Sequence, residues 1–232
     1  MHIYCINLER RPDRRARAES QFERAGLAVE FFPGTDGREH TPDGLYVTPS
    51  EYGCTDSHVR IWRDIVAKGH KVALVLEDDV ELSPNFGSKL EEVLAEAVDW
   101  DMIFLGYILP IVRCDVSENL FEGQPLGTHA YLINLECAQR LSNFDPKLIK
   151  VGIDQQLNRF PLKILCSKTI LASQGDAMSS LGLPSFKSII EGDIGIARTM
   201  DFNFFIRFIM QKCKPMLIYM ITCYLVENLI KD

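Results

Sequence analysis

No uncharged run in this 232-residue sequence is long enough to cross a bilayer as a helix. The apolar C-terminal segment has its longest uncharged stretch at 215–226, which is twelve residues, whereas a spanning helix needs about 20. The N-terminal stretch 1–11 runs directly into a strand pattern and a charged helix pattern, without the apolar core of a signal peptide. We therefore expect a cytoplasmic protein, or one that faces the cytosol.

Cysteine is not arranged as in a zinc site or a redox pair. The seven cysteines include no CxxC pair, and the five histidines do not neighbour them at zinc-ligand spacing. Cys5 and Cys166 lie inside apolar runs typical of strands, so we expect buried free thiols at these two positions. This pattern agrees with a reducing compartment.

The sequence also lacks the common phosphate-binding and nucleophile motifs. It contains no glycine-rich phosphate loop of either common type and no serine elbow, which argues against nucleophilic hydrolysis. The formal net charge of −7 argues against binding through counterion release, so we expect no nucleic-acid partner. An anionic substrate stays compatible with this charge because a bound metal inverts the local sign. Any nucleotide would therefore be held through a metal and carboxylates.

What the sequence does contain is a buried-strand pattern that ends in acidic residues. The apolar run 72–76 favours a strand covered on both faces of an α/β sheet, and Glu77, Asp78 and Asp79 follow it directly. Three adjacent anions are costly to bury without partners, so we expect them at the end of the strand, in a crevice. Carboxylates clustered there favour a hard divalent cation and the phosphates that it carries. The alternative is an acidic, solvated loop after a core strand.

Strand and helix patterns alternate along the first 110 residues, which favours an α/β fold with a mainly parallel sheet and helices on both faces. We expect strands at 2–8, 29–32, 72–76, 102–105, 128–135, 163–166 and 170–172. We expect helices at 10–26, 50–68, 84–98, 136–141 and 153–159. The turn-rich segments 38–49 and 107–127 are expected to be loops. No internal repeat is visible, so residues 1–197 are expected to form one domain.

The segment 198–232 differs in kind from the rest of the chain. It is dense in large apolar residues and carries five Lys or Arg against three Asp or Glu, a net of +2. A basic, apolar helical tail on an acidic body indicates attachment to an anionic membrane surface. The alternative is a pair of helices that packs on the core or in a dimer.

Three further segments are candidates for a site. The arginines within 10–17 follow the first strand at the start of a helix, which suits an anion, although such a run is often only a solvated face. Asp36 follows the second strand, where a base or ribose is commonly held, and a simple turn is the alternative. Gly53 near a helix start indicates that something approaches the backbone closely. Ser57 and His58 lie one turn further on, with a structural histidine as the alternative for the second.

Six stretches of the chain, in order, match one enzyme family. They are INLERRPDRR (6–15), GTDG (34–37), EYGCTDSH followed by IW (51–62), ALVLEDDVEL (73–82), WDMIFLG (100–106) and GTHAYLINLECAQRL (127–141), with a looser match at IDQQL (153–157). On these stretches the chain resembles glycosyltransferase family 25, which includes bacterial lipooligosaccharide galactosyltransferases and collagen galactosyltransferase domains.

The resemblance implies a single nucleotide-sugar-binding domain of the glycosyltransferase A type, with Mn²⁺ or Mg²⁺ as cofactor. It also implies a UDP-sugar donor, UDP-galactose above all, and transfer with inversion at the anomeric centre. The family's Asp-x-Asp metal motif corresponds here to 77–79, so its first acid is a glutamate. By the same resemblance the metal ligands are Asp79 and Asp78. The implied nucleotide-sugar site comprises Asn7, Leu8, Arg11, Arg14, Asp36, Gly37, Ser57, His58, Glu77 and Asp78.

Inversion needs a general base on the acceptor hydroxyl, opposite the leaving group. Asp154 is our candidate because it follows a loop and starts a short helix after the acidic run, with a helix cap as the alternative. Gln174 and Ser179 are candidates for contact with the sugar or the acceptor.

These inferences lead to one expected function and two alternatives. We expect a metal-dependent glycosyltransferase that adds a hexose, galactose above all, to a glycolipid or oligosaccharide acceptor such as lipooligosaccharide, peripherally at the cytosolic membrane face. One alternative is a collagen-type protein galactosyltransferase. The other is a catalytically silent family member that acts as a sugar-binding or scaffolding subunit. A metal-dependent phosphodiesterase is disfavoured because it usually needs more histidine and aspartate ligands.

Overall fold

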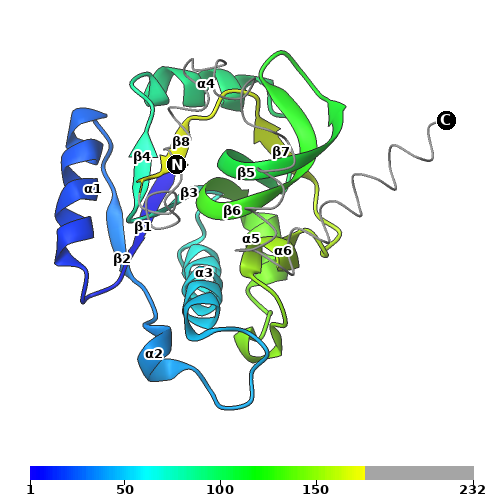
Figure 1. The fold of residues 1–232 in the computed structure, drawn as a ribbon. Helices are drawn as coiled ribbons and strands as arrows, with labels where there is room; N and C mark the ends of the chain where they lie inside the picture. Colours follow the sequence, from blue (N-terminus) through cyan, green and yellow to red (C-terminus); the bar gives the residue numbers. More distant parts are fainter. Residues whose placement is uncertain (176–232) are drawn as a thin grey trace, which may run out of the picture. The chain divides into compact units, whose positions relative to one another are not determined.

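The computed structural model describes residues 1–175, so the predicted tail at 198–232 and the candidate Ser179 lie outside the described residues. The described part is a mixed α/β domain built on one six-stranded sheet (Figure 1). In sheet order the strands are β2 (Glu30–Pro33), β1 (His2–Asn7), β3 (Val72–Glu77), β6 (Leu120–Asn134), β5 (Met102–Asp115) and β7 (Ile164–Ser167). Five strands run in one direction and only β6 runs against its neighbours, which confirms the mainly parallel sheet.

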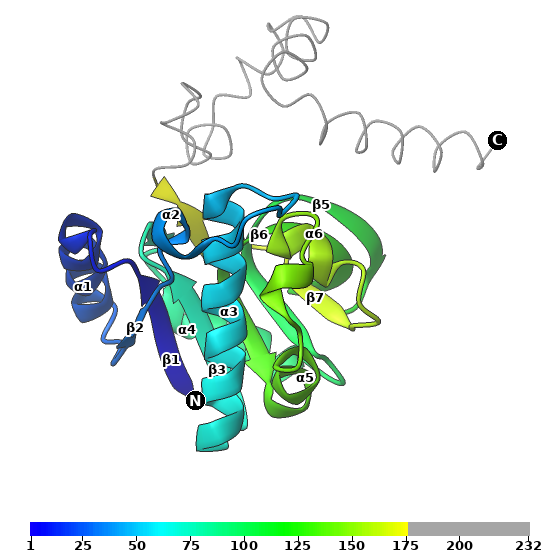
Figure 2. The ribbon, with the colours of Figure 1, turned by 90° about the horizontal axis from the view of Figure 1, so that it is seen from below.

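Helices cover both faces of this sheet, as expected (Figures 1 and 2). One face packs on α1 (Pro12–Arg24) and α4 (Phe86–Glu96), and the other on α3 (Pro49–Lys68), α5 (Leu135–Leu141) and α6 (Ile153–Leu157). Side chains alternate between the two cores along each strand, since successive residues of a strand point to opposite faces. In β3, for example, Val75 belongs to the α3 core and Leu76 to the α1 core.

Local signals in the sequence explain where the main helices begin and end. Helix α3 starts at a capping box, in which Thr48 accepts from the backbone of Glu51 and the Glu51 side chain accepts from the backbone of Thr48. It ends at Gly69, which adopts a left-handed conformation with φ of 68°. Helix α1 has a proline in its first turn and ends just before Gly26, at φ of 67°. Cys5 and Cys166 are buried free thiols, as expected.

The prediction of a loop at 107–127 is wrong. These residues belong to a long antiparallel hairpin, because β5 continues to Asp115 and β6 already starts at Leu120. The pairing of the two strands contains four register shifts, and with these irregularities the strands accommodate proline and glycine while the hydrogen-bonded pairing continues. The expected loop at 38–49 also contains a short helix, α2 (Gly37–His40). A short 3-10 helix, Pro146–Leu148, follows α5.

A second, two-stranded sheet closes the acidic segment. Strand β4 (Val80–Leu82) pairs antiparallel with β8 (Ala172–Gln174), and the backbone N–H of Gly175 donates to the carbonyl of Asp79 at 2.9 Å. The turn that carries the acidic residues is therefore held between β3 on one side and β8 on the other. Within residues 1–175, no helix combines the length and the apolar character that crossing a membrane requires.

Candidate functional site

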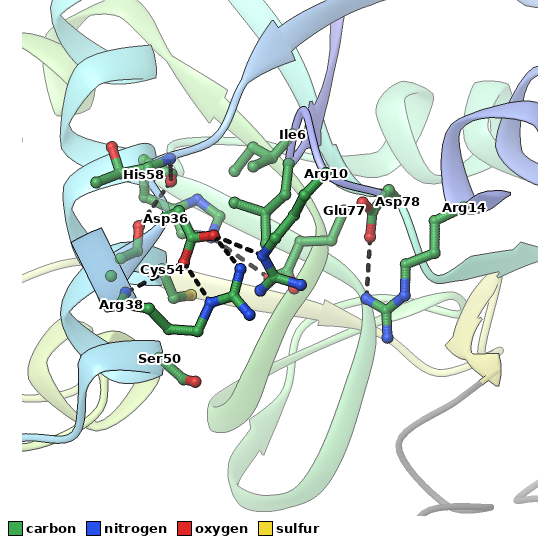
Figure 3. A pocket seen from close by; sticks show the side chains of 15 residues that line it. Ile6, Arg10, Arg14, Asp36, Arg38, Ser50, Cys54, His58, Glu77 and Asp78 are labelled. Carbon is green, nitrogen blue, oxygen red and sulfur yellow. Dashed lines mark hydrogen bonds and ion pairs between the residues drawn. The ribbon is translucent and has the colours of Figure 1, made fainter. Parts of the chain in front are cut away.

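A pocket of about 250 Å³ opens at the carboxyl ends of β1, β2 and β3, beside α2 and the start of α3. This is the edge at which ligands bind in open α/β sheets. Figure 3 shows the pocket with charged side chains around it. Its lining residues are Ile6, Leu8, Arg10, Arg14, Thr35, Asp36, Gly37, Arg38, Ser50, Gly53, Cys54, Ser57, His58, Glu77 and Asp78.

Asp78 and Asp79 form a buried acid pair in the turn between β3 and β4. Their exposed fractions are only 7% and 8%. Asp78 accepts from the side-chain amide of Asn7 at 2.7 Å and from Arg14 Nη1 at 3.1 Å, and the same guanidinium nitrogen lies 3.3 Å from Asp79 Oδ2. Arg14 thus bridges the two carboxylates, which offsets the cost of burying them. The expected crevice is confirmed, and the solvated-loop alternative is wrong.

Glu77 belongs to a separate chain of buried hydrogen bonds that runs through the α3 core. Trp62 Nε1 donates to the hydroxyl of Tyr131 at 3.0 Å, and this hydroxyl lies 2.8 Å from Nδ1 of His58. The other ring nitrogen of His58 is 3.4 Å from Glu77 Oε1, which also accepts from the Thr128 hydroxyl at 2.8 Å. Since a carboxylate only accepts, a neutral His58 must carry its proton on Nε2 and accept from Tyr131.

This network fixes the charge of Glu77. Burial by itself raises the pKa of the Glu77 carboxyl, but the hydrogen bond from His58, the positive charge of that ring in its protonated form and the Thr128 hydroxyl outweigh burial and hold the pKa below its usual value. Cys54, one turn before His58 on α3, behaves differently. Burial and the neighbouring charge of Glu77 raise the pKa of its thiol well above the ordinary range. The pocket therefore contains an ionised carboxylate beside a protonated thiol.

Two arginines converge on Asp36 at the other wall of the pocket. Asp36 caps α2 by accepting from the backbone N–H of Arg38, and its side chain also pairs with the guanidinium groups of Arg38 at 2.7 Å and Arg10 at 2.5 Å. The hydrogen bond from Arg38, then that from Arg10, hold the pKa of Asp36 well below its usual range. Figure 3 shows the three side chains meeting at the pocket. Asp36 thus positions two cations there.

Two glycines allow α2 and α3 to approach closely at the base of the pocket. A Cβ atom on Gly53 would lie 2.5 Å from the carbonyl oxygen of Thr35 and 2.8 Å from the backbone nitrogen of Gly37. A Cβ atom on Gly37 would meet the carbonyl of Pro49 even more closely. The close approach expected at Gly53 is confirmed. Ser57 tightens the same contact, since it accepts from Thr35 N–H at 2.8 Å and donates to the Gly53 carbonyl at 2.6 Å.

Replacing Gly53 with alanine is expected to lower the free energy of unfolding by about 1–3 kcal/mol, the usual cost of overpacking. The added methyl group would collide with backbone atoms, which cannot rotate away as a side chain could. Gly87 in α4 is a matched control, because nothing lies within 4 Å of a Cβ placed there. Gly87→Ala is expected to be neutral or to stabilise by up to about 1 kcal/mol. Urea unfolding of both variants measures the difference, and equal values would contradict the packing argument.

Most of the residues expected at the nucleotide-sugar site do gather at this pocket. Leu8, Arg14, Asp36, Gly37, Ser57, His58, Glu77 and Asp78 line it. Asn7 is not among the lining residues, but its side-chain amide donates to Asp78. Asp79 is bridged to the same Arg14 but is not among the lining residues. Arg11 pairs with Asp13 at 2.7 Å and does not line the pocket.

The candidates from the later part of the chain lie outside the pocket lining. Asp154 accepts from the backbone N–H groups of Gly127 at 2.9 Å and Gln155 at 2.7 Å, which ties the start of α6 to β6. Gln174 lies in β8 and pairs with Val80, next to the acid pair.

Arg10, Arg38 and Cys54 line the pocket although the sequence did not single them out as site residues. Arg10 belongs to a run of five arginines in which no pattern shows which one turns toward Asp36. Arg38 lies in a segment that looked like a loop. Cys54 belongs to the EYGCTDSH stretch, and its spacing of four from His58 was the available signal, since residues four apart share one face of a helix. The expectation that no histidine neighbours a cysteine at metal-ligand spacing is therefore wrong for this pair.

Comparison with known proteins matches this chain to one family. The family model described as "Glycosyltransferase family 25 (LPS biosynthesis protein)" matches residues 1–109. A protein named "Glycosyltransferase 25 family member" from Aedes aegypti is 34% identical over 188 residues, which cover 67% of this chain and 30% of the relative. The chain belongs to glycosyltransferase family 25. All fifteen lining residues of the pocket fall within the part that the family model matches.

Other members of family 25 match over a similar extent. A relative of the same name from Drosophila pseudoobscura pseudoobscura is 35% identical over 183 residues, covering 67% of this chain and 29% of the relative. A human relative, 31% identical over 188 residues, is named "Inactive glycosyltransferase 25 family member 3", with 67% of this chain and 31% of the relative covered. The chain therefore spans about three tenths of the length of the curated relatives that it matches.

Among solved structures, a glycosyltransferase involved in the glycosylation of the major capsid of PBCV-1 is similar at a TM-score of 0.45. The two sequences are 10% identical, and the match covers 71% of this chain and 80% of the chain in that structure. The structure of A197 from STIV is similar at a TM-score of 0.40, with 14% identity and 72% and 81% of the two chains covered.

Proposed function

We propose that this member of family 25 transfers a hexose from a UDP-sugar, UDP-galactose above all, to a lipooligosaccharide-type glycan, with inversion at the anomeric centre. One observation carries the proposal. A single pocket at the carboxyl edge of the sheet combines the acidic turn after β3 with three arginine side chains, Arg10, Arg14 and Arg38. Such a pocket suits a ligand that carries both a diphosphate and a sugar.

The arginines support binding of the diphosphate. Guanidinium groups match phosphate oxygens in geometry as well as in charge, because they donate two parallel hydrogen bonds. Arg10 and Arg38 are held by Asp36 at the pocket wall, with exposed side-chain fractions of 41% and 59%. Their shared carboxylate fixes their position and leaves further donor groups on each guanidinium for a phosphate. We therefore assign the diphosphate to this wall.

The acidic turn supports a divalent cation. Asp78 and Asp79 supply oxygen ligands of the kind that Mn²⁺ and Mg²⁺ prefer, and the family resemblance assigns the ion to these positions. In the structure Arg14 bridges both carboxylates, so a cation would have to share or displace this contact. When bound, the cation would stabilise the negative charge that develops on the leaving UDP. Asp78 and Asp79 would hold the ion, and Asn7 would orient Asp78.

Asp154 remains our proposed general base. Its oxygens accept two backbone N–H groups, which fixes the carboxylate and leaves further lone pairs for an acceptor hydroxyl. Gln174, beside the acid pair in β8, remains the proposed contact to the sugar or the acceptor. The glycolipid acceptor and the peripheral position at the cytosolic membrane face rest on the composition of 198–232.

A catalytically silent sugar-binding subunit is the second candidate. The names of mammalian relatives favour it, since the human and mouse relatives are both named "Inactive glycosyltransferase 25 family member 3". The arginine bridge on the acid pair is also compatible with a protein that binds no cation. Both candidates share the same pocket, so catalysis itself must be measured.

Release of UDP from a panel of UDP-sugars, with Mn²⁺ or with EDTA, tests the proposal. We expect release from one donor that needs Mn²⁺ and falls about 100-fold or more in Asp79→Ala, the scale of losing one electrostatic stabiliser of the transition state. Glu81→Gln removes an exposed acid from the same segment and is expected to keep the activity. Circular dichroism of each variant verifies folding. If the protein binds a donor but turns over none of them, the proposed transferase activity is contradicted and the silent sugar-binding subunit is the better account.

A further inference from the structure

Three side chains with different donor atoms meet at one point on the pocket wall. The Cys54 sulfur, a ring nitrogen of His58 and a carboxylate oxygen of Glu77 all lie within 4.8 Å of one another. All three residues line the pocket, and Figure 3 labels each of them there. They are distinct from the acid pair Asp78 and Asp79, whose carboxylates accept from Arg14 and Asn7 instead.

The fold explains why these side chains converge. Cys54 and His58 are four residues apart on α3 and therefore share one face of that helix. Glu77 is the last residue of β3 and extends toward the same face. Donor atoms spaced in this way need only small side-chain rotations to reach the distances of about 2.0–2.3 Å at which zinc binds nitrogen, oxygen and sulfur.

The surroundings hold the three donors as the second shell of a metal site does. The hydroxyl of Tyr131 lies 2.8 Å from Nδ1 of His58, which fixes the ring and turns Nε2 toward Glu77. The Thr128 hydroxyl donates to Glu77 at 2.8 Å and lies 3.9 Å from the Cys54 sulfur. Hydrogen bonds of this kind orient ligands and commonly change metal affinity by about 10–100-fold.

The donor set selects the class of cation. A thiolate and an imidazole favour a borderline-soft ion such as Zn²⁺ or Co²⁺, whereas Mn²⁺ and Mg²⁺ prefer oxygen ligands. Three protein ligands with a fourth position open to a cavity is the arrangement of reactive zinc sites, while structural zinc sites have four protein ligands. The open side faces the pocket that we assign to the sugar nucleotide.

We propose that Cys54, His58 and Glu77 bind one Zn²⁺ or Co²⁺ ion, with a coordination position open to the pocket. On binding, the S–H bond of Cys54 breaks, the sulfur forms a bond to the metal, and the proton leaves to solvent. His58 binds through Nε2, and the proton of that nitrogen moves by way of solvent to Nδ1, which then donates to the Tyr131 hydroxyl instead of accepting from it. The site stands on these contacts alone and does not depend on the proposed transfer reaction.

Titration of the whole 232-residue chain, freed of metal, with Co²⁺ tests this site, because a thiolate bound to Co²⁺ gives a charge-transfer band in the near ultraviolet. We expect such a band at one equivalent of Co²⁺, and we expect Zn²⁺ to remove it by displacement. Cys54→Ser is expected to abolish the band, and Glu77→Gln to weaken Co²⁺ binding more than about tenfold. Cys114→Ser, which changes an exposed cysteine, is expected to leave the band unchanged.

A further control separates this site from the acid pair. Asp79→Ala is expected to keep the thiolate band even if it abolishes UDP release, so the two proposals can fail independently. The wild-type titration needs no variant to fold, and the absence of a band at saturating Co²⁺ would overturn the proposed site. A band that persists in folded Cys54→Ser would overturn it as well, because the thiolate would then belong to another cysteine.

Discussion

Arg14→Met is expected to lower the free energy of unfolding in metal-free buffer by about 3–5 kcal/mol, the usual cost of removing one partner from a buried ion pair. The guanidinium of Arg14 bridges Asp78 and Asp79, both more than nine-tenths buried. Methionine fills much of the same volume but supplies no charge and no hydrogen bond. Two adjacent carboxylates would then lose the positive charge that bridges them, while Asn7 still donates to Asp78.

Mn²⁺ is expected to restore part of the stability lost in Arg14→Met. A cation that binds only the folded state stabilises it in proportion to the logarithm of its concentration over its dissociation constant. The variant lacks the Arg14 guanidinium, which in the wild type competes with the metal ion for the two carboxylates. We therefore expect Mn²⁺ to raise the melting temperature of the variant more than that of the wild type. Arg24→Met, at an exposed position of the same helix, is the control and is expected to lose no more than about 1 kcal/mol. Equal Mn²⁺ effects on Arg14→Met and wild type would contradict a metal site at the acid pair.

Tyr131→Phe is expected to cost about 3 kcal/mol, because one hydroxyl serves two buried partners. Trp62 Nε1 and His58 Nδ1 both bond to it, and all three side chains are fully buried. Removal of the oxygen leaves two polar atoms without a partner, each at a cost of about 1–3 kcal/mol. Phenylalanine keeps the ring and its packing against Phe104, so the loss isolates the hydrogen bonds from the hydrophobic contact.

Urea unfolding of Tyr131→Phe and Tyr46→Phe measures this contribution. Tyr46 is 85% exposed, and its hydroxyl is therefore expected to contribute almost nothing. A loss in Tyr131→Phe no greater than that in Tyr46→Phe would show that the core network stabilises little. If the network also orients Glu77, proton resonances of His58 should shift in the variant that remains folded.

The sequence predicts the frame of this domain because the determining signals are local. The apolar run 72–76 with the acids behind it becomes β3 and the acidic turn. Gly69 predicts the end of α3 since a left-handed residue at that point needs no side chain. Gly53 predicts that something approaches the backbone closely, and the structure shows that the segment 35–37 occupies the space a Cβ would take. Each of these predictions requires knowledge of only a few neighbouring residues.

The rest of the site depends on contacts that no local pattern contains. Arg10 reaches Asp36 across the sheet edge, and Arg14, rather than Arg11, bridges the acid pair. All three arginines stand in one run, and only the position of α1 on the sheet decides which of them faces inward. The long hairpin was missed for a related reason. Proline and glycine within 107–127 usually mark loops, but bulges in β5 and β6 accommodate them.

The pairing of β4 with β8 gives the acidic turn an unusual place in the order of folding. The N–H of Gly175 reaches back to the carbonyl of Asp79, almost a hundred positions earlier in the chain. Closing so large a loop costs entropy that only later contacts repay, so pairings of this kind form slowly and late. On a ribosome, the turn would gain its last strand only after residue 175 has emerged. The nascent domain would therefore complete its sheet before it completes the turn that carries Asp78 and Asp79.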